Sequence, residues 1–121
     1  MPPLIYIAGP YSAGPNGLDY MGIEANIAKA REAAKWLVEN GFYFFCPHLN
    51  SAHFECIAPD VPAQTWYDLD IRLLKACDAM LLVGAWESSK GVAKEIEVAR
   101  DVGIPVFTVA WTLTAWSRSV V

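Results

Sequence analysis

The chain has 121 residues, of which 55% are hydrophobic and 18% are charged, with a formal net charge of −4. The high apolar content excludes a disordered chain, and the length is typical of one domain spanning residues 1–121. The net negative charge is not typical of a nucleic-acid binder, which carries an excess of Lys and Arg. No apolar run reaches the roughly 20 residues of a membrane span. We therefore expect neither a nucleic-acid polymer nor a membrane as a partner.

The start of the chain and its cysteines indicate a cytoplasmic protein. Met1-Pro2-Pro3 lacks the basic residues and the following apolar stretch of a signal peptide. The three cysteines are odd in number and widely spaced, which argues against a disulfide framework and fits a reducing compartment.

Short apolar runs alternate with helical patterns along the chain. The expected strands are 4–8, 42–46, 79–83 and 104–109. The expected helices run from about 23 to 40, from an N-cap at Thr65 to about 76, and from an N-cap at Ser89 to about 102. Residues 10–22 and 48–62 are expected to be irregular, and residues 110–121 form a C-terminal tail without a clear pattern.

This order of elements is typical of right-handed crossovers in a parallel sheet. We expect a doubly wound α/β fold of the flavodoxin or Rossmann type, with about four to five strands and helices on both faces. Strands buried on both faces would absorb most of the apolar residues. Ligands of such folds bind beyond the carboxyl ends of the strands, which places the site among Gly9, residues 46–48 and the 84–91 loop.

Two carboxylates fall on the apolar faces of the predicted helices. At about 100° per residue, Asp70 lies between Leu73 and Leu74 in angle. Glu95 lies between Ala99 and Val102 in the same way. A carboxylate on a core-facing stripe carries a desolvation cost of several kcal/mol unless it is paired. One such group is more often a loop cap or half of an ion pair, but two that converge on one cleft indicate an acid/base or nucleophile pair.

Three motifs occur in these elements. The first is the run 5–11, which contains the pattern YxAGP, and the second is Asp70 followed eight positions later by Asp78. The third is S-x-G-x-x-x-E-x-x-x-A over residues 89–99. Together they resemble the nucleoside 2-deoxyribosyltransferase family over residues 4–109. The chain is most similar to small phage and bacterial members and to the related 2′-deoxynucleoside 5′-monophosphate N-glycosidases.

The resemblance implies cleavage of the N-glycosidic bond of 2′-deoxynucleosides or their 5′-monophosphates. Glu95 would be the nucleophile on the anomeric carbon, Asp70 would protonate or steer the leaving base, and Tyr6 would hold the Glu95 carboxylate. A nearby carboxylate stabilises or traps the oxocarbenium-like transition state of such a reaction. Water would then complete hydrolysis, which is favoured here, or a second base would complete transfer.

Substrate-binding residues are expected at the same edge of the sheet: Gly9, Pro10, Tyr11, His48, Trp86, Ser89 and Gly91. Ser89 bears on the substrate, because the monophosphate hydrolases place Ser at this position whereas members acting on free nucleosides tend to place an acidic residue. A hydroxyl at a helix N-terminus is suited to a phosphate, although a plain N-cap is an equal alternative. The chain departs from the family at Glu97, where Gly is common, and its first loop lacks a basic phosphate ligand.

Other sites and functions have less support. The loop after the first strand lacks the Lys and Ser/Thr of a P-loop and the GxGxxG of a dinucleotide site, and no cofactor is expected. Cys46, His48, His53 and Cys56 cluster locally, but their spacing matches no zinc pattern, and no metal is expected. The alternative function is a non-catalytic nucleotide-binding or interaction module on the same fold. A flavodoxin-type FMN carrier is a third and weaker alternative.

Tryptophans mark both the predicted cleft and the tail. Trp66 and Trp86 flank the cleft, where core packing is the simpler role and stacking on a base the alternative. In the resembling family, the C-terminal region of a neighbouring subunit helps to close the site. We therefore expect a homodimer or higher homo-oligomer in which Trp116, Ser117 and Arg118 reach a partner.

Overall fold

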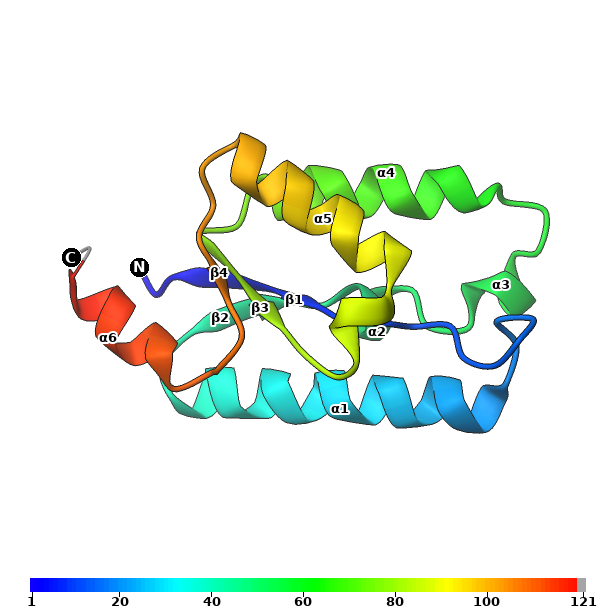
Figure 1. The fold of residues 1–121 in the computed structure, drawn as a ribbon, viewed down its shortest axis with the longest axis horizontal. Helices are drawn as coiled ribbons and strands as arrows, with labels where there is room; N and C mark the ends of the chain where they lie inside the picture. Colours follow the sequence, from blue (N-terminus) through cyan, green and yellow to red (C-terminus); the bar gives the residue numbers. More distant parts are fainter. Residues whose placement is uncertain (120–121) are drawn as a thin grey trace.

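A computed structural model describes residues 1–119 and contains a four-stranded parallel sheet between two layers of helices (Figure 1). The strands are β1 (Leu4–Ala8), β2 (Tyr43–Phe45), β3 (Ala79–Leu82) and β4 (Val106–Phe107). The helices are α1 (Tyr20–Glu39), α2 (Pro47–Asn50), α3 (Phe54–Ile57), α4 (Ala63–Leu74), the 3-10 turn η1 (Trp86–Ser88), α5 (Lys90–Asp101) and α6 (Thr112–Ser119). The predicted doubly wound α/β class is confirmed.

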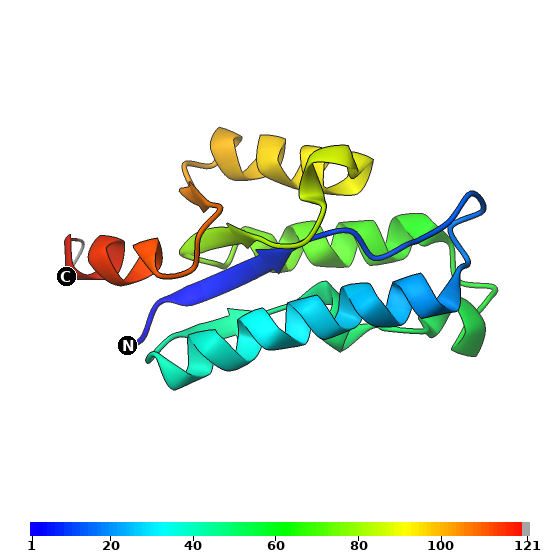
Figure 2. The same ribbon diagram turned by 60° about the horizontal axis from the view of Figure 1, so that its bottom comes forward.

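The strand order is β2-β1-β3-β4. The chain passes from β1 to β2 in one direction and then from β2 across β1 to β3 and β4 in the other. Right-handed crossovers in opposite directions put their helices on opposite faces. Accordingly, α1 covers one face of the sheet, whereas α4 and α5 cover the other (Figures 1 and 2). The order reverses beside β1, so the carboxyl ends of β1 and β3 border the crevice in which folds of this kind bind ligands.

Side chains of β1 alternate between two hydrophobic cores. Ile5 and Ile7 pack with the buried face of α1, and Tyr6 and Ala8 pack toward α4 and α5. All four are at most 1% exposed. The phenol of Tyr6 is therefore a polar group placed inside the core beneath α5.

The edge strands are less buried than expected. β3 is buried at every position, but β2 and β4 are only partly buried, and Tyr43 is 51% exposed. β4 is also shorter than the predicted 104–109, because its ladder with β3 includes only Val106 and Phe107. The expectation of four strands buried on both faces is wrong for these two edges, and the helix faces hold the remaining apolar residues.

The starts of α4 and α5 differ in how well the sequence predicts them. Ser89 is the N-cap of α5, and its side chain accepts a hydrogen bond from the backbone N–H of Val92 at 3.2 Å, as expected. α4 begins at Ala63 rather than after Thr65, because Pro62 occupies the N-cap position with an extended backbone. Within residues 1–119, no helix combines the length and the apolar character needed to cross a membrane.

The stretch 48–62, expected to be irregular, holds α3 and most of α2.

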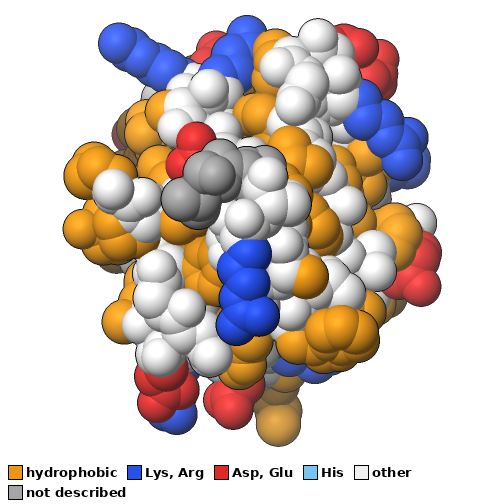
Figure 3. All heavy atoms as spheres, turned by 90° about the vertical axis from the view of Figure 1, so that its left-hand side faces the viewer, with side chains coloured by type: hydrophobic (Ala, Val, Ile, Leu, Met, Phe, Trp, Pro, Cys, Tyr) orange, Lys and Arg blue, Asp and Glu red, His pale blue; other side chains and the backbone are white. Residues whose placement is uncertain are grey.

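The C-terminal tail forms α6, whose Trp116 ring lies 5.5 Å from the ring of Phe107 in the same chain. Trp111 is instead 70% exposed. Figure 3 shows this end of the molecule, where hydrophobic side chains are exposed among polar ones. The partner contact expected of the tail stays a prediction, and residues 120–121 lie outside the described part.

Candidate active site

A cavity of about 570 Å³ opens at the carboxyl end of β1, which is the edge where the crevice was expected. This volume is within the range of roughly 300–1,000 Å³ that is usual for small-molecule sites. The end of β1 and its loop, α2, α4 and the start of α5 supply the lining residues: Ile7, Ala8, Gly9, Pro10, Tyr11, Ser12, Pro47, His48, Ser51, Trp66, Tyr67, Asp70, Ser88, Ser89, Lys90, Gly91, Val92 and Glu95.

Most of the predicted site residues meet at this cavity. The lining includes both predicted carboxylates and the predicted substrate-binding residues Gly9, Pro10, Tyr11, His48, Ser89 and Gly91. Tyr6 lies below the cavity floor and reaches it through Glu95. Trp86 instead packs against the core cluster beneath α5, whereas Trp66 lines the wall.

Glu95 on α5 is joined to β1 by a side-chain hydrogen bond. The hydroxyl of Tyr6 donates to Oε2 of Glu95. Burial raises the pKa of Glu95 to about 7, and the nearby Asp70 carboxylate raises it as well, while the Tyr6 hydrogen bond lowers it. Burial and the Glu95 carboxylate raise the pKa of Tyr6 far above its ordinary value, so this phenol remains a donor. The Glu95 carboxylate is thus held in a fixed, poorly hydrated position.

Asp70 reaches the same cavity from α4. Burial raises the pKa of Asp70 to about 6. Its Oδ1 atom is buried and has no hydrogen-bond partner within residues 1–119. Two carboxyl groups with raised pKa values therefore share one cavity, a pattern typical of acid/base and nucleophilic chemistry. Because the two interact, they titrate as a pair in which one proton is held near neutral pH.

The N-terminus of α5 forms another part of the wall. The first amide groups of a helix have no acceptor within the helix, and Lys90 and Gly91, which carry such amides, both line the cavity. A Cβ on Gly91 would meet only Ser89 Oγ, at 3.9 Å, so the space beside Gly91 is open. Open amides and the helix dipole make this region suited to an anion or a polar oxygen.

Gly9 has a steric role at the end of β1. A Cβ at this position would lie 2.8 Å from both Cγ2 and the carbonyl oxygen of Val83. Only glycine therefore lets the chain leaving β1 pass so close to the chain leaving β3. This close approach positions the loop that carries Pro10 and Tyr11 along the cavity.

His48 is a neutral wall residue. Its Nε2 lies 2.8 Å from the carbonyl oxygen of Pro10, and because a carbonyl only accepts, Nε2 carries the proton. Burial lowers the pKa of His48, which favours the uncharged ring. Its ring packs edge-on against that of Tyr11, with 5.6 Å between the centroids. His48 thus ties α2 to the loop after β1 and supplies no positive charge.

Sequence reasoning missed several lining residues, including Tyr67 and Ser51. Tyr67 lies three positions before Asp70 on α4 and therefore on the same side of the helix, a signal that could have identified it. The ammonium group of Lys94 lies 5.8 Å from the centre of the Tyr67 ring, which links α4 to α5 near the cavity. Ser51 follows the short helix α2, and no sequence pattern marks it.

Asp78, the second aspartate of its motif, lies away from the cavity. Its Oδ2 accepts a hydrogen bond from the backbone N–H of Leu4 at 2.8 Å. Asp78 therefore fixes the start of β1 beside β3, and Asp70 is the aspartate of this motif that faces the site.

The cysteines and histidines between residues 46 and 56 do not converge. Cys46 is buried, and burial raises the pKa of its thiol to about 11. His53 pairs with Glu24, and Cys56 lies 3.1 Å from the hydroxyl of Tyr20. In the part of the chain that the structure describes, no three His, Cys, Asp or Glu side chains are grouped closely enough to hold a metal ion.

Residues 3–109 match a protein family described as a domain of unknown function (DUF7768). The chain belongs to this family. Its fold is similar to that of a 2-deoxyribosyltransferase from the psychrotolerant bacterium Bacillus psychrosaccharolyticus, described as a biocatalyst for nucleoside synthesis. The two are 22% identical with a TM-score of 0.54, over 85% of this chain and 69% of that chain. The likeness shows a shared fold, as the sequence motifs predicted. No curated protein is similar enough to match the sequence.

Proposed function

We propose that this protein cleaves the N-glycosidic bond of 2′-deoxynucleoside 5′-monophosphates or of the free 2′-deoxynucleosides, with Glu95 as the nucleophile. The observation that carries this proposal is the pair of carboxyl groups, Glu95 held by Tyr6 and Asp70 on α4, which line one cavity of about 570 Å³. The three sequence motifs and the fold shared with a 2-deoxyribosyltransferase support it.

The reaction has two steps that balance without a cofactor. A carboxylate oxygen of Glu95 forms a bond to C1′ while the bond from C1′ to the base nitrogen breaks, and the base leaves with the electron pair. The carboxylic acid of Asp70 supplies the proton that the departing base takes up. In the second step Asp70, now a carboxylate, accepts a proton from water, the hydroxyl adds to C1′, and Glu95 leaves as a carboxylate. A second base in place of water would complete base exchange.

The pair of carboxyl groups holds the single proton that these roles require. The raised pKa values of Asp70 and Glu95, about 6 and about 7, mean that the pair holds one proton over this range. The state with Glu95 ionised and Asp70 protonated is the one that reacts. Because Glu95 has the higher pKa, the single proton lies mainly on Glu95, and the reacting state is the less populated of the two. Tyr6 raises the share of the reacting state, because its hydroxyl donates to the Glu95 carboxylate.

The wall at the start of α5 supports a 5′-monophosphate as the substrate. Ser88, Ser89, Lys90 and Gly91 all line the cavity. Within residues 1–119, Lys90 is the one lysine or arginine of the lining, and the open helix N-terminus favours negative charge. Ser89 accepts a bond from Val92 but keeps its own hydroxyl proton, which is free to donate to a phosphate. Because Ser89 also matches the monophosphate hydrolases that the sequence resembles, we place hydrolysis ahead of base exchange.

A product assay tests the proposal. The protein is incubated with dCMP, dUMP, dTMP, dAMP, dGMP and the corresponding nucleosides, with and without an acceptor base, and free base is measured by chromatography. We expect release of base from at least one monophosphate, and little release from the matching ribonucleotide. Saturable quenching of tryptophan fluorescence without release of any base would instead support the binding-module alternative, since Trp66 lines the cavity.

A further inference from the structure

α3 lies at the end of the cavity far from the sheet, and it is held in an unusual way. None of the residues of α3 is buried, so no face of this short helix packs into a hydrophobic core. Its apolar contact with the wall is the ring of Phe54, which packs edge-on against that of Trp66 with 5.2 Å between the centroids. The other attachments of this segment are polar, and they begin at Tyr11 and α1.

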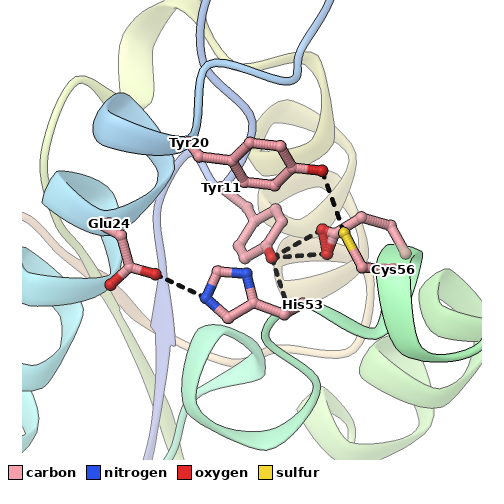
Figure 4. Close-up of polar contacts among 6 residues, drawn as sticks. Tyr11, Tyr20, Glu24, His53 and Cys56 are labelled. Atoms are coloured by element: carbon pink, nitrogen blue, oxygen red, sulfur yellow. Dashed lines mark hydrogen bonds and ion pairs between the residues drawn. The ribbon is translucent and has the colours of Figure 1, made fainter.

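Tyr11 is the polar anchor on the cavity side. Its hydroxyl donates to the carboxylate of Glu55, 2.8 and 3.0 Å from the two oxygens, and accepts the backbone N–H of His53 at 2.8 Å. Figure 4 shows the Tyr11 ring between α1 and the α3 segment, with these bonds converging on its hydroxyl. Burial is the largest influence on this phenol and raises its pKa to about 12, so the proton remains on the oxygen.

These contacts decide what Tyr11 presents to a ligand. A phenol has one proton, and here Glu55 accepts it. The hydroxyl therefore has no proton left to donate to a ligand, and the ring forms the cavity wall. The position of that ring depends on Glu55, which lies outside the cavity lining.

Two further contacts join the same segment to the start of α1. Nε2 of His53 lies 2.6 Å from Oε1 of Glu24, and the hydroxyl of Tyr20 lies 3.1 Å from Sγ of Cys56 (Figure 4). His53 also adopts a left-handed backbone with φ of 67°. Segments held by exposed polar contacts, with few buried apolar ones, open at low free energy.

We propose that Glu55 is a positioning residue of this site, which fastens α3 over the end of the cavity and holds the Tyr11 ring at the wall through the Tyr11 hydroxyl. Release of this contact frees α3 and the ring together, so that ligand binding weakens while the carboxyl pair at Glu95 is unaffected. The identity of the ligand rests on the proposed function, but the fastening of α3 does not.

The kinetic test compares Glu55→Ala, Glu55→Gln and Tyr11→Phe with a control, Glu32→Ala, which changes an exposed side chain of α1 that makes no hydrogen bond or ion pair within residues 1–119. For base release from the best monophosphate substrate, Glu55→Ala is expected to raise KM by roughly tenfold with kcat unchanged. Glu55→Gln keeps an acceptor for the phenol and should remain close to the parent. In the Tyr11→Phe background, Glu55→Ala should add nothing. A fall in kcat at constant KM, an unchanged KM, or additive effects in the double variant would overturn the positioning role.

Amide hydrogen exchange on the unliganded protein tests the fastening independently of any activity. Both Glu55→Ala and Tyr11→Phe should speed exchange of the amides from 53 to 58 by about tenfold, with α4 unchanged, while Glu55→Gln and Glu32→Ala should not. Unchanged exchange at these amides would overturn the proposal. If the parent protein releases no base from any substrate, the proposed function fails, and the exchange rates still decide whether Glu55 and Tyr11 hold α3.

Discussion

The buried phenol of Tyr6 donates a hydrogen bond to the Glu95 carboxylate, which joins the middle of the central strand β1 to the second turn of α5. β1 pairs with a strand on each side, so the phenol is held by the most constrained part of the sheet. A donor fixed in this way orients a carboxylate at no further cost in conformational freedom when a ligand binds. The central strand of the sheet thus holds the Glu95 carboxylate, the reacting group of the proposed site, in position.

The pH dependence of base release should be bell-shaped. The reactive pair holds one proton, so activity is expected to peak between about 6 and about 7, the raised pKa values of Asp70 and Glu95. In Asp70→Asn the falling alkaline limb should disappear. Its rising limb should then report the ionisation of Glu95 alone, at a pH below the pKa of about 7 that Glu95 has beside the Asp70 charge. A profile of kcat/KM that keeps both limbs in Asp70→Asn would contradict these assignments.

Burial of Glu95 should cost stability at neutral pH. Its pKa rises from 4.5 to about 7 on folding, so in this range the folded state keeps a proton that the unfolded state has released. The free energy of unfolding therefore falls as pH rises through this window and is level above it. Glu95→Gln should raise the free energy of unfolding by up to about 3 kcal/mol at pH 8 and by little at pH 4.

Urea denaturation at the two pH values measures this difference, with the exposed change Glu32→Gln as the control. A Glu95→Gln gain of equal size at both pH values would show that the carboxyl group is not the source.

Gly9 and Gly91 should respond oppositely to alanine. Gly9→Ala places a Cβ 2.8 Å from the Val83 backbone oxygen, so β1 and β3 must separate, at an expected cost of about 1–3 kcal/mol. Gly91→Ala meets only an atom at 3.9 Å and should retain or slightly raise stability, because alanine favours the helix. Its methyl group would, however, stand in the cavity before the open amides and raise KM for a monophosphate. Thermal unfolding and kinetics on both variants check this, and a stable Gly9→Ala variant would refute the steric role.

Two substitutions separate the capping role of Ser89 from its proposed binding role. Ser89→Ala removes the acceptor for the Val92 amide and should cost about 1 kcal/mol of stability. Ser89→Asp keeps an acceptor at the N-cap and should retain that stability. If the start of α5 binds a 5′-phosphate, the negative charge of Ser89→Asp should raise KM for monophosphates but not for free nucleosides. Equal effects on the two substrate classes would argue against a phosphate at this position.

The parts of the site that the sequence predicts are those with strong periodic signals. Asp70 and Glu95 interrupt apolar helix faces, and this conflict between charge and burial is visible without a structure. The Ser89 cap and the apolar run of β1 are equally local signals. The fold then follows from their order, because right-handed crossovers leave few topologies for alternating strands and helices.

The parts that could not be predicted depend on contacts between distant segments. Four residues such as those of α3 are too few for a periodic pattern, and α3 is held by Tyr11, which is more than 40 positions away. Val102 matches the apolar period of α5 but is 49% exposed, because it follows the last helical turn at the C-cap. Trp86 has the sequence position of a cleft residue, yet it is only partly buried and packs against the core instead.

The most direct test of the central claim is base release by Glu95→Gln on the best substrate of the parent protein. The amide side chain of this variant keeps the shape of the carboxylate and accepts the Tyr6 hydrogen bond, but it cannot form the bond to C1′. We predict a loss of activity on the order of 10³-fold or more, with the fold and ligand binding retained. Release of base at the parental rate by this variant would contradict the assignment of Glu95 as the nucleophile.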